Sequence, residues 1–154
     1  MSEKYLIFGA TGSIGSSLSR QLKQSGKEVH LVARNESEVK KLSEELGCTF
    51  TVADVLENGF VDKVKAEVPD VKGIAYCVGS IVLKPLRMIK EDEFNQCMKL
   101  NCYSALEVIR GYQDTLKKSK GSVVLFSTVA VRRGFSNHGI IASAKAAVEG
   151  LTVS

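Results

Sequence analysis

The 154-residue chain is predicted to be one doubly wound α/β domain, a parallel sheet with helices on both faces. Three observations predict this fold. Apolar runs of strand length alternate with helical patterns along the whole chain. The strand runs are apolar throughout, as expected when both faces of a sheet are covered. A glycine-rich turn joins the first run to the first helix. The alternation of strands and helices gives repeated β-α-β units, which connect parallel strands by right-handed crossovers.

The expected elements follow one another without a linker or a repeat. Strands are expected at residues 4–10, 28–34, 48–54, 73–79 and 122–128. Helices are expected at residues 13–26, 36–47, 56–68 and roughly 91–117, with a last helix from about Ser143. Asn35 and Glu38 form an N-cap box before the second helix, and Gly26 and Gly47 stand where helix C-caps belong.

Composition and charge restrict the classes of function. The net charge of +4, from 21 basic and 17 acidic residues, is mild and spread along the chain, which argues against nucleic acid as a partner. No run reaches the roughly 18 apolar residues of a membrane span. The four cysteines lack metal-binding spacing and are expected to be buried free thiols: Cys48, Cys77, Cys97 and Cys102. We expect no metal site, no membrane contact and a cytoplasmic location.

The glycine-rich turn predicts a nucleotide site. In "IFGATGSIGSSL", three glycines lie between the first strand and the first helix. Glycines there permit a tight turn and let a pyrophosphate approach the N–H groups at the helix N-terminus. The alternative is a turn that is merely tight. The expected cofactor contacts from this turn and the helix start are Gly9, Thr11, Gly12, Ser13, Ile14 and Gly15.

The ends of the second and third strands suggest which dinucleotide is bound. NAD sites usually carry an acid about 20 residues after the glycines, where it meets the adenosine ribose. Here Ala33 occupies that position and Arg34 follows it, and an arginine can pair with a 2′-phosphate. NADP(H) is therefore preferred and NAD(H) stays possible, with a solvated Arg34 as the alternative. Asp54, followed by Val55, could receive the adenine amino group or cap the next helix.

An asparagine lies within the apolar face of the expected long helix. On a helical projection, Asn101 falls at the centre of that face, where an unpaired amide is costly. It therefore needs a partner, either structural or at a functional site. Leu100, Tyr103 and Leu106 form a second apolar strip, which suggests contact with a helix of another subunit and hence a homo-oligomer.

The sequence resembles the short-chain dehydrogenase/reductase family over its whole length. The matching stretches are "GATGSIG", "ADV", "AYCVG", "KLNCYSALEV", "GSVVLFSTVAV" and "ASAKAAVEGLT". The resemblance implies a Rossmann-type fold in three α/β/α layers, with strand order 3-2-1-4-5 as far as the chain goes. It also implies NAD(P)(H) binding and hydride transfer to or from the carbonyl or alcohol of a small molecule.

In that family a serine, a tyrosine and a lysine do the chemistry together with an asparagine. Position by position, Lys145 matches the lysine that holds the nicotinamide ribose and lowers the pKa of the tyrosine. Asn101 matches the asparagine that anchors a proton-relay water, and Thr128 matches the serine that orients the carbonyl. The resemblance thus implies these three residues as the catalytic group.

Two departures from the family pattern bear on function. Ile141 stands where the family has its acid/base tyrosine, and losing a positioned general acid typically costs about a hundred- to ten-thousand-fold in rate. The turn Cys77-Val78-Gly79, an expected cofactor contact, stands where the family often has Asn-Ala-Gly. Other candidate proton donors near the gap are Ser127, Thr128, His138 and Ser143.

The leading hypothesis is an NADP(H)-dependent oxidoreductase that acts on an unidentified carbonyl or hydroxyl compound. Family members continue past the position of the final "EGLTVS" through further strands and a substrate-covering segment, so the chain is expected to be a fragment. The rival hypothesis is a non-catalytic dinucleotide-binding protein, a sensor or partner subunit, or an inactive fragment. Arg132 and Arg133 could meet an anionic substrate or form a solvated pair.

Overall fold

The computed structural model describes residues 3–154, and its centre is a five-stranded parallel sheet in the order β3-β2-β1-β4-β5. The expected strand order is therefore confirmed. The strands end earlier than expected, and the residues that follow them form loops at the carboxyl edge of the sheet. Their bounds are β1 (Lys4–Phe8), β2 (Glu28–Ala33), β3 (Thr49–Val52), β4 (Gly73–Tyr76) and β5 (Ser122–Leu125).

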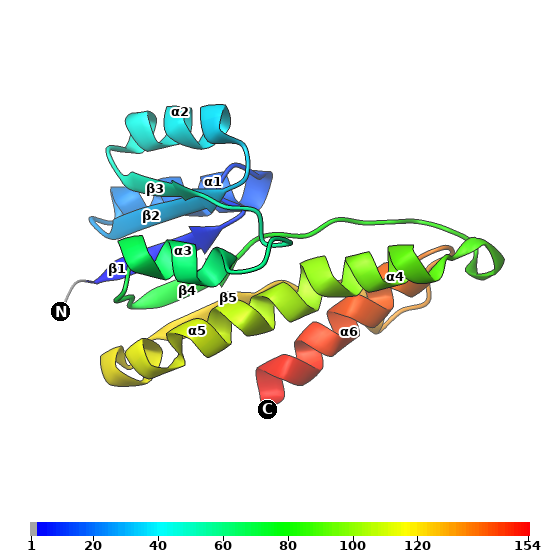
Figure 1. Ribbon diagram of the computed structural model, residues 1–154. Helices are drawn as coiled ribbons and strands as arrows, with labels where there is room; N and C mark the ends of the chain where they lie inside the picture. The colour runs from blue at the N-terminus through cyan, green and yellow to red at the C-terminus, as the bar shows by residue number, and fades with distance from the viewer. Residues whose placement is uncertain (1–2) are drawn as a thin grey trace.

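Helices cover both faces of this sheet, which gives the expected three layers (Figure 1). One face packs against α1 (Ser13–Gln24) and α2 (Glu36–Leu46). The other packs against α3 (Phe60–Glu67) and α5 (Ser104–Ser119). Two further helices, α4 (Glu91–Met98) and α6 (Gly139–Val153), pack against each other through a smaller apolar cluster. Short 3-10 segments lie at Leu86–Met88 and Val129–Val131.

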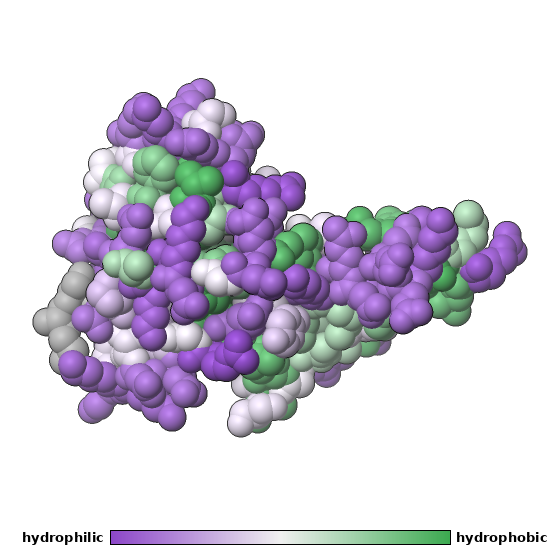
Figure 2. All heavy atoms as spheres, viewed as in Figure 1, coloured by the Kyte–Doolittle hydropathy of each residue, from purple (hydrophilic) through white to green (hydrophobic). Residues whose placement is uncertain are grey.

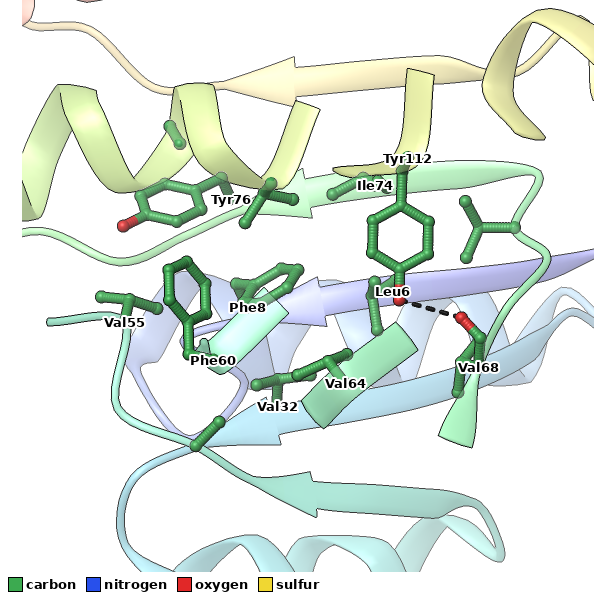
Figure 3. Close-up of a cluster of buried hydrophobic side chains, with 14 of the residues drawn as sticks. Leu6, Phe8, Val32, Val55, Phe60, Val64, Val68, Ile74, Tyr76 and Tyr112 are labelled. Atoms are coloured by element: carbon green, nitrogen blue, oxygen red, sulfur yellow. Dashed lines mark hydrogen bonds between the residues drawn. The ribbon is translucent and has the colours of Figure 1, made fainter. Parts of the chain in front are cut away.

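The core is divided between the two faces of the sheet because neighbouring strand residues point in opposite directions. Phe8 belongs to the core under α3 and α5, whereas Ile7 belongs to the core under α1 and α2. Figure 3 shows the first of these cores, in which the Tyr112 hydroxyl donates to the carbonyl oxygen of Val68 over 2.9 Å. That bond satisfies a phenol that would otherwise be buried without a partner.

The expected long helix is interrupted. It consists of α4, a π-helix at Lys99–Tyr103, and α5. A π turn adds one residue to a helical turn, so a single helical projection cannot predict which residues are buried on both sides of it. Asn101 and Ser104 are buried, while Cys102 is only half-buried. The interruption moves the apolar face just where the chain passes the carboxyl edge of the sheet.

Two helices begin elsewhere than expected. α3 begins at Phe60 rather than residue 56, because Gly59 before it adopts a φ of 77°. α6 begins at Gly139 rather than near Ser143, because Asn137, with a φ of 65°, turns the chain just before it. The expected caps of α2 are confirmed: Asn35 accepts from the backbone N–H of Glu38, and Gly47 closes the helix with a φ of 58°.

The surface carries apolar residues where the sequence predicted an edge and a docking strip. Val124 of the edge strand β5 is 49% exposed. Tyr103 and Leu106 are also exposed, but Leu100 packs against the core under α3 and α5, so its assignment to the strip was wrong. Figure 2 shows polar residues over most of the sheet and the helices that cover it. More apolar residues lie over the part of the molecule that contains α4 and α6.

The cysteines are free thiols, as expected, but only Cys97 is buried; Cys48, Cys77 and Cys102 are half-buried. Within residues 3–154, none of the helices has both the length and the apolar character needed to cross a bilayer.

His30 is a buried titratable group in the middle of the sheet. It lies on β2 and is 1% exposed. Its Nδ1 lies 2.7 Å from the hydroxyl of Thr49 and its Nε2 lies 2.9 Å from the hydroxyl of Thr51, both on β3. A hydroxyl can donate or accept, so either tautomer of the neutral imidazole is satisfied. Burial, aided by the charge of Lys4, lowers the pKa of His30 from 6.5 to about 4.

We expect His30 to make the folded protein less stable in acid. In the unfolded chain it protonates near pH 6.5 and in the folded chain only near pH 4, so the unfolded state binds more protons between these values. The free energy of unfolding should therefore fall by up to about 3 kcal/mol from pH 6.5 to pH 4. Urea unfolding at several pH values measures this fall. His30→Gln, which keeps a polar side chain but does not titrate, should remove most of it; an unchanged slope in that variant would contradict the assignment.

Candidate functional site

A cleft of about 390 Å³ lies at the carboxyl edge of the sheet, where the loops after β1, β2, β3 and β4 meet. The sheet order reverses between β1 and β4, and doubly wound sheets bind their ligands at this reversal because the loops on either side diverge. Most of the predicted cofactor residues line the cleft: Gly9, Thr11, Gly12, Arg34, Asp54, Val55, Cys77, Val78 and Gly79.

The glycine turn forms one end of this cleft through close backbone packing. Gly9 has a φ of 72°, and a Cβ on it would lie 2.9 Å from the carbonyl carbon of Cys77. A Cβ on Gly15 would overlap the carbonyl oxygen of Gly9. Any side chain at these two positions would therefore push α1 or the loop after β4 away from the turn.

The start of α1 offers N–H groups rather than side chains. Gly12 is the N-cap and makes no side-chain hydrogen bond, so the first N–H groups of the helix have no capping side chain. These groups belong to Ser13, Ile14 and Gly15, which are not among the residues lining the cleft. Uncapped N–H groups at a helix N-terminus favour an anion such as a phosphate.

The rim of the cleft carries one cation and one carboxylate. Arg34 follows β2, is exposed, and takes part in none of the ion pairs found among residues 3–154. Ala33 beside it is buried, so no acidic side chain stands at the position where NAD sites usually carry one. Asp54 follows β3, and its Oδ1 accepts from the backbone N–H of Leu56 over 2.9 Å. The N-cap of α3 is Gly59, so the alternative in which Asp54 caps that helix is wrong.

Cys77 and Val78 line the cleft directly after β4. Burial raises the pKa of the Cys77 thiol to about 11, so this side chain is neutral near pH 7. A thiol is a weak hydrogen-bonding group. This wall therefore offers a ligand its main chain and apolar surface.

The π-helix places Asn101 in the interior. Asn101 is 1% exposed, and its Nδ2 donates to the carbonyl oxygen of Cys97 over 3.0 Å and to that of Ser80 over 3.4 Å. Its Oδ1 is the buried side-chain atom without a partner in the described part of the chain. The expected need for a partner is thus met only by the amide nitrogen. Such an orphaned oxygen, in a π turn, marks a place where a ligand or water belongs.

Lys145 of α6 approaches Asn101 at Gly79. A Cβ on Gly79 would lie 2.9 Å from Asn101 Oδ1 and 3.6 Å from Lys145 Nζ. Burial lowers the pKa of Lys145, while the thiols of Cys97 and Cys102 act in the opposite direction. Two of the three residues implied as catalytic by the family resemblance therefore converge, from different helices, on a glycine that lines the cleft.

Thr128 and two neighbouring candidate positions, Ser127 and Ile141, make contacts within the chain. Thr128 begins the 3-10 turn, and its Oγ1 accepts from the backbone N–H of Ala130 over 3.3 Å. Ser127 beside it donates to the carboxylate of Glu149 in α6 over 2.7 Å. Ile141 is 2% exposed and packs in the apolar cluster between α4 and α6. The position of the missing tyrosine is therefore part of a core.

The cleft also includes residues that the sequence did not point to. The ends of parallel strands meet at one edge, and this rule could have found the residues contributed by β2 and the loop after β3. No sequence pattern marked Gln96 and Leu100 as cleft residues. Only the path of the loop before α4 brings α4 and the π-helix to the cleft. The unpredicted residues are Val32, Ala33, Ala53, Leu56, Ser80, Gln96 and Leu100.

Comparisons with known proteins agree with this geometry. Residues 9–154 match the family described as enoyl-(acyl carrier protein) reductase. An uncharacterised oxidoreductase of Saccharomyces cerevisiae is 32% identical over 96% of this chain and 62% of its own length. A tropinone reductase homologue of Arabidopsis thaliana is 31% identical over 97% of this chain and 50% of its own. A solved alcohol dehydrogenase of Thermococcus sibiricus, complexed with 5-hydroxy-NADP, matches with a TM-score of 0.90 at 24% identity, over 98% of this chain and 68% of that one.

These similarities extend across almost all of the chain, although it spans only 62% and 50% of the two curated relatives. The TM-score of 0.90 shows that the solved structure shares the fold of this chain. Since the family match covers residues 9–154, this chain belongs to the short-chain dehydrogenase/reductase family.

Proposed function

We propose that this protein is an oxidoreductase that transfers a hydride between NADP(H) and the carbonyl or hydroxyl group of a small molecule. Residues 3–154 form a dinucleotide-binding domain, and the protein works in the cytoplasm. The observation that carries the proposal is the make-up of the cleft. It has a glycine cradle for a pyrophosphate, an exposed guanidinium on the rim, and the approach of Asn101 to Lys145 beside Gly79.

The residues present fit a dinucleotide along the length of the cleft. The uncapped start of α1 suits the pyrophosphate, and Arg34 suits a 2′-phosphate on the adenosine ribose. Asp54 suits the adenine amino group, and Lys145 suits the nicotinamide ribose. Bound NADP(H) supplies or accepts the hydride. Thr128 orients the carbonyl, because its hydroxyl proton stays available while its oxygen accepts from Ala130.

Cofactor preference tests this proposal at Arg34. The parent protein should bind NADPH more tightly than NADH, because a guanidinium–phosphate pair is a charge-assisted hydrogen bond. Arg34→Ala should reduce the affinity for NADPH about 10- to 100-fold and leave that for NADH nearly unchanged. Fluorescence titration with both nucleotides measures this. Arg133→Ala, which removes an exposed arginine outside the cleft, is the matched control. Equal affinities in the parent would remove the support for NADP(H).

A second candidate function, a non-catalytic dinucleotide-binding protein, is favoured by one observation. Ile141 is buried in an apolar cluster with Cys97, Ile140 and Ala144, at the position where the family resemblance implies an acid/base. A chain of this kind would bind NADP(H) in the same cleft and sense or exchange it without turnover. The two functions predict the same affinity for nucleotide, so activity must separate them.

Restoring the phenol separates the two functions. Ile141→Tyr should raise NADPH-dependent reduction of aliphatic and aromatic ketones by about a hundredfold or more if Asn101 and Lys145 are placed for catalysis. The larger ring should cost roughly 1–3 kcal/mol of stability, because it enters a packed cluster. Ile141→Phe carries the same ring without the hydroxyl and is the control. Absence of ketone reduction in the parent and in both variants, with all three folded and binding NADPH, would favour the non-catalytic function.

The proposal includes a homo-oligomer and a small-molecule partner. The exposed Tyr103 and Leu106 are the residues of the predicted strip that remain available for a second subunit. Arg132 donates to Glu149 over 3.0 Å, which leaves Arg133 as the neighbouring cation for an anionic substrate. No nucleic acid or membrane partner is proposed.

A further inference from the structure

Carbonyl reduction in this cleft needs a proton for the oxygen, and Ile141 cannot supply it. We propose that the ammonium group of Lys145 is itself the proton donor, in place of the family's tyrosine. This inference rests on the proposed oxidoreductase function. It assigns Lys145 a catalytic role beyond the ribose contact that the family resemblance implies.

The position of Lys145 carries this inference. Its Nζ lies 3.6 Å from the point that a Cβ on Gly79 would occupy, and Gly79 lines the cleft. None of the five ion pairs among residues 3–154 includes Lys145. Lys145 does not itself line the cleft, but its side chain brings a half-buried cation close to Gly79, and no carboxylate among residues 3–154 pairs with it.

The surroundings of Lys145 make its proton easier to lose. Two influences change the pKa of Lys145. One is its burial away from water, and the other is the two nearby thiols of Cys97 on α4 and Cys102 in the π-helix. Burial lowers the pKa of Lys145 and is the largest effect. Burial also raises the pKa of both cysteines, so they are neutral near pH 7 and do not hold the ammonium proton as thiolates would. A general acid is most effective when its pKa lies near the working pH.

Asn101 provides a second, independent observation. Its Oδ1 is buried without a partner and lies 2.9 Å from the same Gly79 point. Both atoms therefore lie on the Cβ side of Gly79, around a common point, where a water molecule would find one donor and one acceptor. A water held there accepts from Lys145 and donates to Asn101, so it can return a proton to the amine after each turnover.

Three of the other candidate donors make contacts elsewhere, and the fourth, Thr128, carries an aliphatic hydroxyl that is a far weaker acid than an ammonium group. Ser127 donates to Glu149, and Ser143 donates to the carbonyl oxygen of Gly139 over 2.8 Å. The Nδ1 of His138 lies 2.8 Å from the carbonyl oxygen of Ser136. That histidine also precedes Lys145 by seven residues, roughly 10 Å along the helix axis. Asn101 Nδ2 also donates to the sulfur of Cys97 over 3.3 Å, but burial raises the pKa of that thiol and so makes it a poorer proton donor. Lys145 is the cationic side chain that approaches Asn101 beside Gly79.

The proposed step balances. Bound NADPH would supply the hydride for the carbonyl carbon and would be oxidised by giving it up. The carbonyl π pair moves to the oxygen, which forms an O–H bond as an N–H bond of Lys145 breaks. The neutral amine then takes a proton from water through the site beside Asn101.

The first test reads the lysine directly and needs no substrate. Reductive methylation with ¹³C-formaldehyde, followed by NMR titration, gives the pKa of each lysine, and Lys145→Arg identifies the signal of Lys145. We expect Lys145 to titrate at least about one pH unit below the main group of lysine signals. Gly79→Ala should change this titration, because its methyl group would press on Asn101 Oδ1. Gly134→Ala, whose Cβ meets nothing within 4 Å, is the matched control.

The second test compares that pKa with kinetics in the longest natural form of the protein. The rate of NADPH-dependent ketone reduction should fall above the pKa measured by NMR, because the ammonium form is the reactive one. Asn101→Asp places a carboxylate beside the amine and should move both pKa values upward together. Lys145→Arg keeps the charge but cannot release a proton near neutral pH, so kcat should fall about a hundredfold with NADPH affinity nearly unchanged. Ser143→Ala, on the same helix, should keep the parent rate.

The outcomes separate this inference from the function on which it rests. If Lys145→Arg keeps the parent rate, or if Lys145 titrates with the other lysines, Lys145 is not the donor, while the oxidoreductase function stands. If NADPH does not bind, or if neither the parent nor Ile141→Tyr reduces any ketone, the proposed function fails and the inference fails with it. Agreement of the two pKa values in the parent protein supports the inference without relying on any variant.

Discussion

The close backbone approach at the glycine turn is the contact on which the rest of the molecule depends. Gly9 adopts a left-handed conformation against the main chain of Cys77, and Gly15 lets α1 rest on the turn with no side chain between them. A Cβ at either place would separate β1 from its helix or from the loop after β4. The cleft exists because these loops close at one point and diverge from there toward Arg34 and Gly79. The glycines that allow this close packing therefore also shape the cleft.

The π-helix has a comparable effect on the opposite end of the cleft. The extra residue of the π-helix lets α4 pack against α6 while α5 packs against the sheet. The two helices therefore do not need one continuous apolar face. The consequence is a buried Asn101 whose amide nitrogen is bonded and whose oxygen is not. An unpaired buried oxygen is destabilising by itself, and folded proteins keep such atoms mainly where a ligand or water completes them. The stability lost there is consistent with a place built for function.

Binding and proton transfer are physically separable in this chain. The groups that suit a dinucleotide are mostly backbone, and they depend on glycines and strand ends that the sequence preserves. The acid/base position depends on one side chain, and Ile141 has turned it into part of a core. Burial lowers the pKa of Lys145, so its ammonium group is a stronger acid than that of an exposed lysine. In the proposed function, cofactor binding and the supply of a proton therefore depend on different residues.

Local patterns in the sequence were sufficient to predict the glycine turn, the cap at Asn35 and the position of Arg34, because each depends on residues close together in the chain. The sheet order was implied by the family resemblance and is confirmed. Local patterns were not sufficient for the interrupted helix, the start of α6, or the contribution of Leu100 to the core. These depend on how segments distant in sequence pack. The meeting of Asn101, Lys145 and Gly79 was decided only by the tertiary structure. No local pattern records which side chains from different helices share a point in space, or which buried oxygen is left without a partner.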